Sequence, residues 1–150
     1  MSKYLVVANQ TLGGDHLIEE VRRRAAAGPS SFYVLVPNTR SVDAARASGA
    51  PLAPATTSSS EEEDHRATMI CQSRLHQALA RLRAEGLEAR GDLGDPEPLT
   101  AIADALTVEQ FDEIIISTLP SGISRWLHMD LPSRAERRFK LPVTTVTAGA

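Results

Sequence analysis

The sequence predicts a single α/β domain with a Rossmann-like, five-stranded parallel sheet and helices on both faces. Short apolar runs alternate with longer segments whose apolar residues recur every three or four positions. The first strand, helix and second strand together fit into about 35 residues, the size of a βαβ unit. The chain has 150 residues, of which 42% are hydrophobic, enough for one core but not for two large domains. We therefore expect one domain over residues 1–150.

The N-terminal part predicts a strand, a helix and a second strand. Residues 3–9 form a continuous apolar run that closes on a polar residue, as expected for a strand buried on both faces. Asp15 is expected to cap a helix that ends at a Gly-Pro pair. The basic residues 22–24 in this helix are expected to lie in solvent. Residues 32–36 form the second buried strand, which a proline stops.

The middle of the chain predicts a loop followed by a long helix. Residues 39–64 are rich in Ala, Ser, Thr and Pro and offer little to bury, so we expect a mobile loop. A helix is expected over residues 65–85, with Gly86 ending it. Cys71 lies on the apolar stripe of this helix, which indicates a buried and inert thiol.

The C-terminal part completes the alternation of strands and helices. Residues 91–94 (Gly-Asp-Leu-Gly) are typical of a turn. Asp95 followed by Pro96 predicts the start of a helix, because a carboxylate caps well and proline fits the first helical position. The other predicted elements are strands at 87–90, 114–116 and 142–147 and a helix at 131–139.

A sheet with helices on both faces contains a point where the winding direction reverses. Ligands bind there, beyond the carboxyl ends of the strands. The segment after the strand at 114–116 carries hydroxyls, an arginine and the single Trp of the chain. The candidate binding residues that follow the strands are Asn9, Gln10, Thr11, Val36, Pro37, Ser117, Thr118, Gly122, Ser124, Arg125 and Asp130.

The sequence lacks the motifs of common catalytic sites. It has no Walker-type phosphate loop, no Gly-x-Gly-x-x-Gly and no Gly-x-Ser-x-Gly. No cluster of ligands indicates a metal site. Surface positions are expected for the scattered histidines His16, His65, His76 and His128. The carboxylates that remain as candidate general bases are Asp92, Asp95 and Asp130. We therefore expect a protein without enzymatic activity.

Composition also bears on partners and compartment. The net charge of −3 and the pI of 5.8 argue against binding to a nucleic-acid backbone. The sequence contains no stretch of about 20 apolar residues, so it predicts no membrane segment. A single cysteine forms no internal disulfide, which fits a reducing, cytoplasmic location.

Two stretches in the last third of the chain resemble the universal stress protein family. Residues 122–127 (Gly-Ile-Ser-Arg-Trp-Leu) are similar to the Gly-Leu-Ser-Arg-Leu-Leu of that family. Residues 134–146, with Leu-Pro-Val near their end, are similar to its last helix and closing Cys-Pro-Val strand. The order of predicted elements resembles the family over nearly the whole chain. The resemblance implies the strand order 3-2-1-4-5.

The resemblance also implies a nucleotide site. ATP-binding members hold adenine against the backbone at the end of the second strand, here Val36 and Pro37. They use an Asp at the end of the first strand, where this sequence has Asn9. Their phosphates lie on a Gly-rich loop and at the start of the following helix.

This sequence departs from the family at the phosphate end. Thr118 or Leu119 stands where the first glycine is expected, and Met129-Asp130 replaces a Gly-Ser pair. Glycines let phosphate oxygens approach the backbone closely, and Met129 fills that space. Asp130 is expected to cap the last helix and to repel a triphosphate. We therefore expect no required cofactor, with ATP or AMP as weak ligands at most.

Two functions remain open at this stage. The first is a non-catalytic regulatory or interaction module in a stress response, forming a homodimer through the last strand, from Pro142 to Thr147. Such a strand at a sheet edge offers unpaired backbone to a second copy. The alternative is a sensor that binds an adenine nucleotide or small anion at the carboxyl ends of the first, second and fourth strands.

Overall fold

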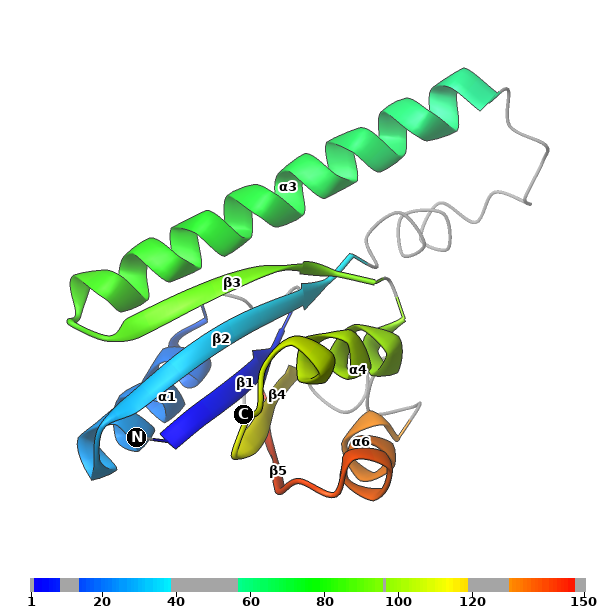
Figure 1. Cartoon of the computed structure of the whole chain (residues 1–150). Coiled ribbons are helices and arrows are strands. Elements are labelled where there is room, and N and C mark those ends of the chain that lie inside the picture. The colour runs from blue at the N-terminus through cyan, green and yellow to red at the C-terminus, as the bar shows by residue number, and fades with distance from the viewer. Residues whose placement is uncertain (1, 9–13, 39–56, 96, 119–129, 148–150) are drawn as a thin grey trace.

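The elements follow the predicted alternation of strands and helices (Figure 1). This computed structural model describes residues 2–8, 14–38, 57–95, 97–118 and 130–147 and, within residues 57–67, only the side chains of His65 and Arg66. The elements are β1 (Ser2–Val7), α1 (Asp15–Ala27), β2 (Ser30–Pro37), α3 (Thr57–Ala84), β3 (Glu88–Gly94), α4 (Pro98–Val108), β4 (Glu113–Thr118), α6 (Leu131–Phe139) and β5 (Val143–Thr147).

The strands form one parallel sheet in the order β3-β2-β1-β4-β5. This confirms the predicted fold class and the strand order that the family resemblance implies. β1 lies in the middle, with Val7 level with Leu35 of β2 and with Ile116 of β4. Because all pairs are parallel, the carboxyl ends of the strands meet at one edge of the sheet (Figure 1).

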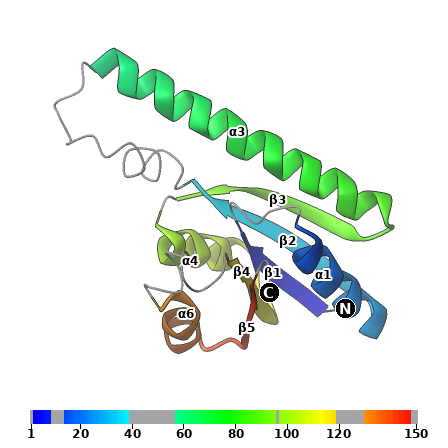
Figure 2. The ribbon, with the colours of Figure 1, turned by 180° about the vertical axis from the view of Figure 1, so that it is seen from behind.

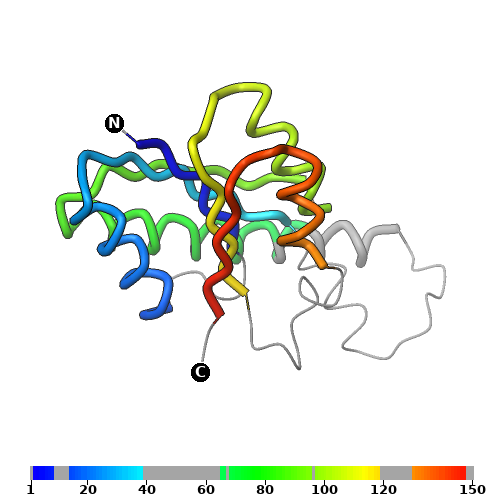
Figure 3. The backbone as a smooth tube through the Cα atoms, turned by 90° about the horizontal axis from the view of Figure 1, so that it is seen from below, coloured from blue at the N-terminus to red at the C-terminus, as the bar shows by residue number. Residues whose placement is uncertain are grey.

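Helices cover both faces of the sheet. α1 and α3 pack on one face, and α4 and α6 pack on the other (Figure 2). A view from below shows α1 and α4 on opposite sides of the strands (Figure 3). Alternation along β1 divides its side chains between the two faces: Val6 belongs to the first core, and Leu5 and Val7 to the second.

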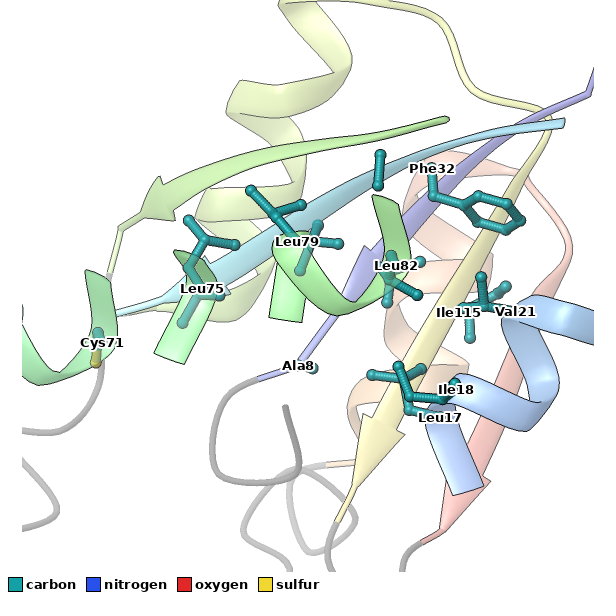
Figure 4. Packing of buried hydrophobic residues seen from close by; sticks show 14 residues of the cluster. Ala8, Leu17, Ile18, Val21, Phe32, Cys71, Leu75, Leu79, Leu82 and Ile115 are labelled. Atoms are coloured by element: carbon teal, nitrogen blue, oxygen red, sulfur yellow. The ribbon is translucent and has the colours of Figure 1, made fainter. Parts of the chain in front are cut away.

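The core beneath α3 begins partway along that helix. The side chains of Cys71, Leu75 and Leu82 point to the sheet (Figure 4). Cys71 is fully buried, as the sequence predicts. On the N-terminal side of Cys71, Met69 and Ile70 are exposed. The first part of α3 therefore extends past the packed sheet, beyond the arrowheads of β2 and β3 (Figure 1).

Helix starts differ from the predictions. α1 has Gly14 as its N-cap with no side-chain cap bond, and Asp15 instead pairs with Arg81 at 2.9 Å. α3 begins at Thr57, so residues 57–64 are helical and do not belong to the expected loop. Residues 61–63 are glutamates, which are good helix formers and favour a helix that extends upstream of residue 65. Residues 39–56 lie outside the described residues.

The third strand is longer than predicted. Residues 91–94 were expected to turn, but they continue β3 and pair with residues 34–37 of β2. Gly91 explains the difference, since a Cβ at this position would lie 2.3 Å from the carbonyl oxygen of Val34. The glycine here serves close strand packing and does not mark a chain reversal.

The start of α4 is shifted from the predicted Asp95. Asp95 accepts a hydrogen bond from the backbone N–H of Glu97 at 2.9 Å, a local turn before the helix. Glu97 is the N-cap and accepts from Thr100 N–H at 2.7 Å. Pro98 then occupies the first helical position, so the expected carboxylate–proline pattern is used two residues further on.

The sequence predicts that the basic end of α1 lies in solvent, but Arg24 is largely shielded and paired. Arg24 has a side-chain exposure of 22% and bonds to Glu20 at 3.0 Å. It reaches Glu113 of β4 at 2.6 Å and donates to Thr144 of β5 at 3.0 Å. The guanidinium also lies 5.6 Å from the centre of the Tyr4 ring. Arg24 thus ties α1 to three strands.

Among the described helices, none combines the length and apolar character that a membrane span requires.

Candidate functional site

The winding of the sheet reverses between β1 and β4. The chain leaves β1 toward α1 on one face and leaves β4 toward α6 on the other. The end of β4 brings two polar side chains to this point, Ser117 with 1% and Thr118 with 2% exposure. Such a switch point is where open α/β sheets bind ligands. The structure therefore places these two predicted residues at the expected location.

His16 lies beside Ser117 at the switch point. Its Nε2 atom is 3.1 Å from Ser117 Oγ, which joins the first turn of α1 to the end of β4. Burial lowers the pKa of His16, although Asp15 and Glu19 oppose this effect by favouring its charged form. A neutral imidazole can both donate and accept a hydrogen bond. This residue supplies the site with an adaptable polar group.

Sequence reasoning missed His16, which was expected to be a surface residue like the other histidines. A signal for it was present in the chain order. The helix that follows the central strand starts at the carboxyl edge of the sheet, so polar residues in its first turn face the switch point. His16 is the second residue of that helix.

Thr118 contacts the neighbouring edge strand. Its Oγ1 lies 3.5 Å from Oγ1 of Thr147 at the end of β5. The contact is long for a bond between hydroxyls, and either atom is able to donate. The carboxyl ends of β4 and β5 thus carry hydroxyls side by side at the same edge of the sheet.

The end of β2 carries a buried valine, a proline and an amide side chain. Val36 is in the core with 1% exposure and pairs with Leu93 of β3, so neither its side chain nor its backbone is open to solvent. Pro37 ends the strand, and Asn38 follows. The Asn38 amide donates to Thr68 Oγ1 of α3 at 2.8 Å, and its oxygen lies 3.8 Å from Cys71 Sγ. α3 is thereby held over this end of β2, a link that sequence reasoning missed.

Asp130 is the N-cap residue of α6, but its side chain does not cap the helix as predicted. Its backbone is left-handed, with φ 55° and ψ 40°, whereas a capping side chain needs an extended backbone. Pro132 also removes one N–H that a cap would bind. The Asp130 side chain is 64% exposed and lies 4.0 Å from Arg137. Its charge is therefore turned mostly to water.

Other predicted residues are not brought into the site. Asp92 accepts from the adjacent Leu93 N–H at 2.8 Å, so it makes a local contact. In the part of the chain that the structure describes, no three His, Cys, Asp or Glu side chains are grouped as a metal site would need. The candidates that lie outside the described residues are Asn9, Gln10, Thr11, Gly122, Ser124 and Arg125.

Neither a protein-family model nor a curated protein sequence matches the chain. Solved structures do match its fold. A universal stress protein from Archaeoglobus fulgidus is 18% identical, with 97% of this chain and 93% of that chain covered and a TM-score of 0.56. A universal stress protein family protein from Arabidopsis thaliana with AMP bound is 10% identical, with coverages of 100% and 94% and a TM-score of 0.60.

A third structure, of a protein from the universal stress protein family of Burkholderia pseudomallei, is 15% identical. It matches 97% of this chain and 95% of its own, with a TM-score of 0.52. The three likenesses extend over nearly the whole chain. At these identities they establish the fold, and function has to be argued from the site.

Proposed function

We propose that this chain, which has the universal stress protein fold, is a non-catalytic regulatory module that binds a nucleoside monophosphate in preference to ATP. The observation that carries the proposal is the His16–Ser117 pair at the topological switch point. The Arabidopsis protein of the same fold was solved with AMP bound, which supports an adenine nucleotide as the ligand class. The ligand is a weakly bound signal and not a required cofactor, and the buried free cysteine fits a cytoplasmic setting.

The two sides of the switch point suit different parts of such a ligand. At the end of β2, Val36 and Pro37 stand where the family resemblance implies that the base lies. At the head of α6, Asp130 places a negative charge near the side of the switch point toward which a long phosphate tail would extend. Because Asp130 is 64% exposed, the repulsion of a phosphate at 4 Å is near the value in water, about 1 kcal/mol. This penalty falls on the triphosphate.

Neutralising Asp130 is expected to raise the affinity for ATP. About 1 kcal/mol corresponds to roughly fivefold in Kd, so Asp130→Asn should bind ATP about five times more tightly than wild type. AMP binding should change little. Calorimetric titrations with adenosine, AMP and ATP measure the effect.

The matched control is Asp104→Asn, which removes the same charge from an exposed position on α4. It should leave all three affinities unchanged. Tighter binding of ATP than AMP by the wild-type protein would contradict the proposal, as would hydrolysis of ATP.

We also propose that the module is a homodimer through β5. This strand is at the edge of the sheet. Val143 packs against the core under α6 and Val146 against the core under α1, so β5 is partly buried from both faces, and Thr145 is exposed. An edge strand of this kind pairs readily with a symmetry-related copy.

Thr145→Glu is expected to shift the dimer to monomer. In a two-fold contact, the new carboxylate meets its own copy or a close neighbour, and like charges across strands are unfavourable. Light scattering measures the molar mass of wild type, of Thr145→Glu and of the control Thr107→Glu on α4. A wild-type protein that is wholly monomeric at micromolar concentration rules the dimer out.

A further inference from the structure

Arg74 of α3 carries a buried nitrogen without a partner. Its Nη1 atom is shielded from solvent and makes no hydrogen bond. Among the described side chains, no other buried nitrogen or oxygen atom lacks a hydrogen-bond partner. An unsatisfied buried donor destabilises the fold, and a charged one does so more strongly. A cationic donor kept at such a cost points to an anionic acceptor that binds from outside the chain.

The position of Arg74 follows from the contacts of α3 with α1. Arg81 of α3 pairs with Asp15, the first residue of α1, and Glu85 pairs with Arg22 further along α1. Arg74 precedes Arg81 by two helical turns, so it lies on the same side of α3 and about 10 Å closer to the carboxyl edge of the sheet. The side of α3 that contacts α1 therefore carries Arg74 just beyond the start of α1.

The start of α1 is itself favourable for an anion. Gly14 is the N-cap and no side chain of the described residues caps the helix, so the amides of its first turn lack the usual side-chain acceptor. The helix dipole adds positive potential there. Of the nearby carboxylates, Asp15 pairs with Arg81, and Glu19 lies one turn further along α1. His16, with its lowered pKa, adds a neutral donor beside Ser117. Arg74 adds a cation whose Nη1 has no partner.

We propose that Arg74 binds the phosphate of a phosphate monoester, beside the first turn of α1 at the carboxyl edge of the sheet. The inference rests on the proposed nucleotide function and deepens it by assigning the anion-binding residue. The unpaired Nη1 is able to form a charge-assisted hydrogen bond to phosphate. It places the phosphate on the α1 side of the switch point, away from the carboxylate of Asp130.

The test compares Arg74→Gln with Arg66→Gln, a control that removes the same charge from an exposed position of the same helix. Calorimetry measures AMP and adenosine binding to each variant. Loss of a charge-assisted bond corresponds to at least about tenfold in Kd. Arg74→Gln is therefore expected to weaken AMP binding tenfold or more and to leave adenosine binding unchanged, while Arg66→Gln changes neither.

Thermal unfolding provides an independent readout. Without ligand, Arg74→Met should raise Tm by about 2–4 °C, because the variant no longer buries an unsatisfied cation. Inorganic phosphate, compared with chloride at equal ionic strength, should raise the Tm of wild type and of Arg66→Met but not of Arg74→Met. A lower Tm for ligand-free Arg74→Met, or equal phosphate stabilisation of all three proteins, overturns the inference.

The outcomes separate this inference from the proposed function. If wild type binds AMP and adenosine and Arg74→Gln binds AMP equally well, the nucleotide site stands and Arg74 is not its phosphate contact. If wild type binds neither AMP nor adenosine but phosphate still stabilises it through Arg74, the anion site stands and the nucleotide function fails. If wild type binds none of AMP, adenosine and phosphate, both the proposed function and this inference are overturned.

Discussion

Gly91→Ala is expected to lower the free energy of unfolding by about 3 kcal/mol, at the upper end of the range for overpacked cores. The added Cβ would lie 2.3 Å from the carbonyl oxygen of Val34 and 3.1 Å from Leu75 Cδ1. The first neighbour is backbone of the adjacent strand, so it has no rotamer into which to retreat. β3 must shift away from β2, weakening the pairing of residues 88–94 and the packing of α3. For a chain of this size, Tm should fall by about 6–12 °C.

Urea unfolding of Gly91→Ala and of Gly28→Ala measures this difference. Gly28 lies in the connection between α1 and β2, has an extended φ of 162°, and a Cβ there meets nothing within 4 Å. Its replacement should change stability by less than about 0.5 kcal/mol. Equal effects of the two substitutions would show that β3 does not lie against β2 as described.

Arg24→Met is expected to destabilise the fold by about 3 kcal/mol, the lower end of the range for breaking a buried ion pair. Burial opposes the charge on Arg24, but its hydrogen bonds to Glu113 and Glu20 prevail and raise the pKa of the guanidinium. Methionine keeps much of the apolar stem over Tyr4 but leaves Glu113 without the Arg24 cation and Glu20 with Arg23 alone. The loss therefore reports on the charge network and not on packing alone.

The control is Arg23→Met on the same helix. Arg23 also pairs with Glu20, at 2.8 Å, but its side chain is 76% exposed. An exposed pair contributes at most about 1 kcal/mol, so this variant should unfold close to wild type. Glu113→Gln should share part of the Arg24→Met loss. If Arg23→Met and Arg24→Met are equally mild, the network on α1 does not join it to β4 and β5.

Much of the fold was predictable because the buried strands of a parallel sheet consist of consecutive apolar residues. The strand at 114–116 and the helix at 131–139 show this well, and both lie where expected. The predictions were wrong where the local sequence favours one structure and contacts with distant residues favour another. Residues 91–94 have the composition of a turn, yet the neighbouring strand selects glycine there for close approach. No local pattern carries that information.

The place of the candidate site in the fold was predictable from the sequence, but several of the residues near it were not. Ser117 follows the most apolar strand, so its place at the carboxyl edge was evident from the order of elements. His16 was missed because it reaches Ser117 across 101 residues of sequence, and the shielded nitrogen of Arg74 has no local signature in the sequence. Asp130 was correctly placed at the head of α6, but its capping role was wrong, since a left-handed backbone conformation is not visible in residue type.

The most direct test of a ligand site at the switch point is the nuclear magnetic resonance spectrum of the histidine side chains during titration with AMP at fixed neutral pH. Burial lowers the pKa of His16, so its ring is neutral under these conditions and its resonances report on contact. We expect the His16 signals to shift saturably and those of the exposed His65 and His76 to stay in place. An unchanged His16 resonance at saturating AMP would contradict the account.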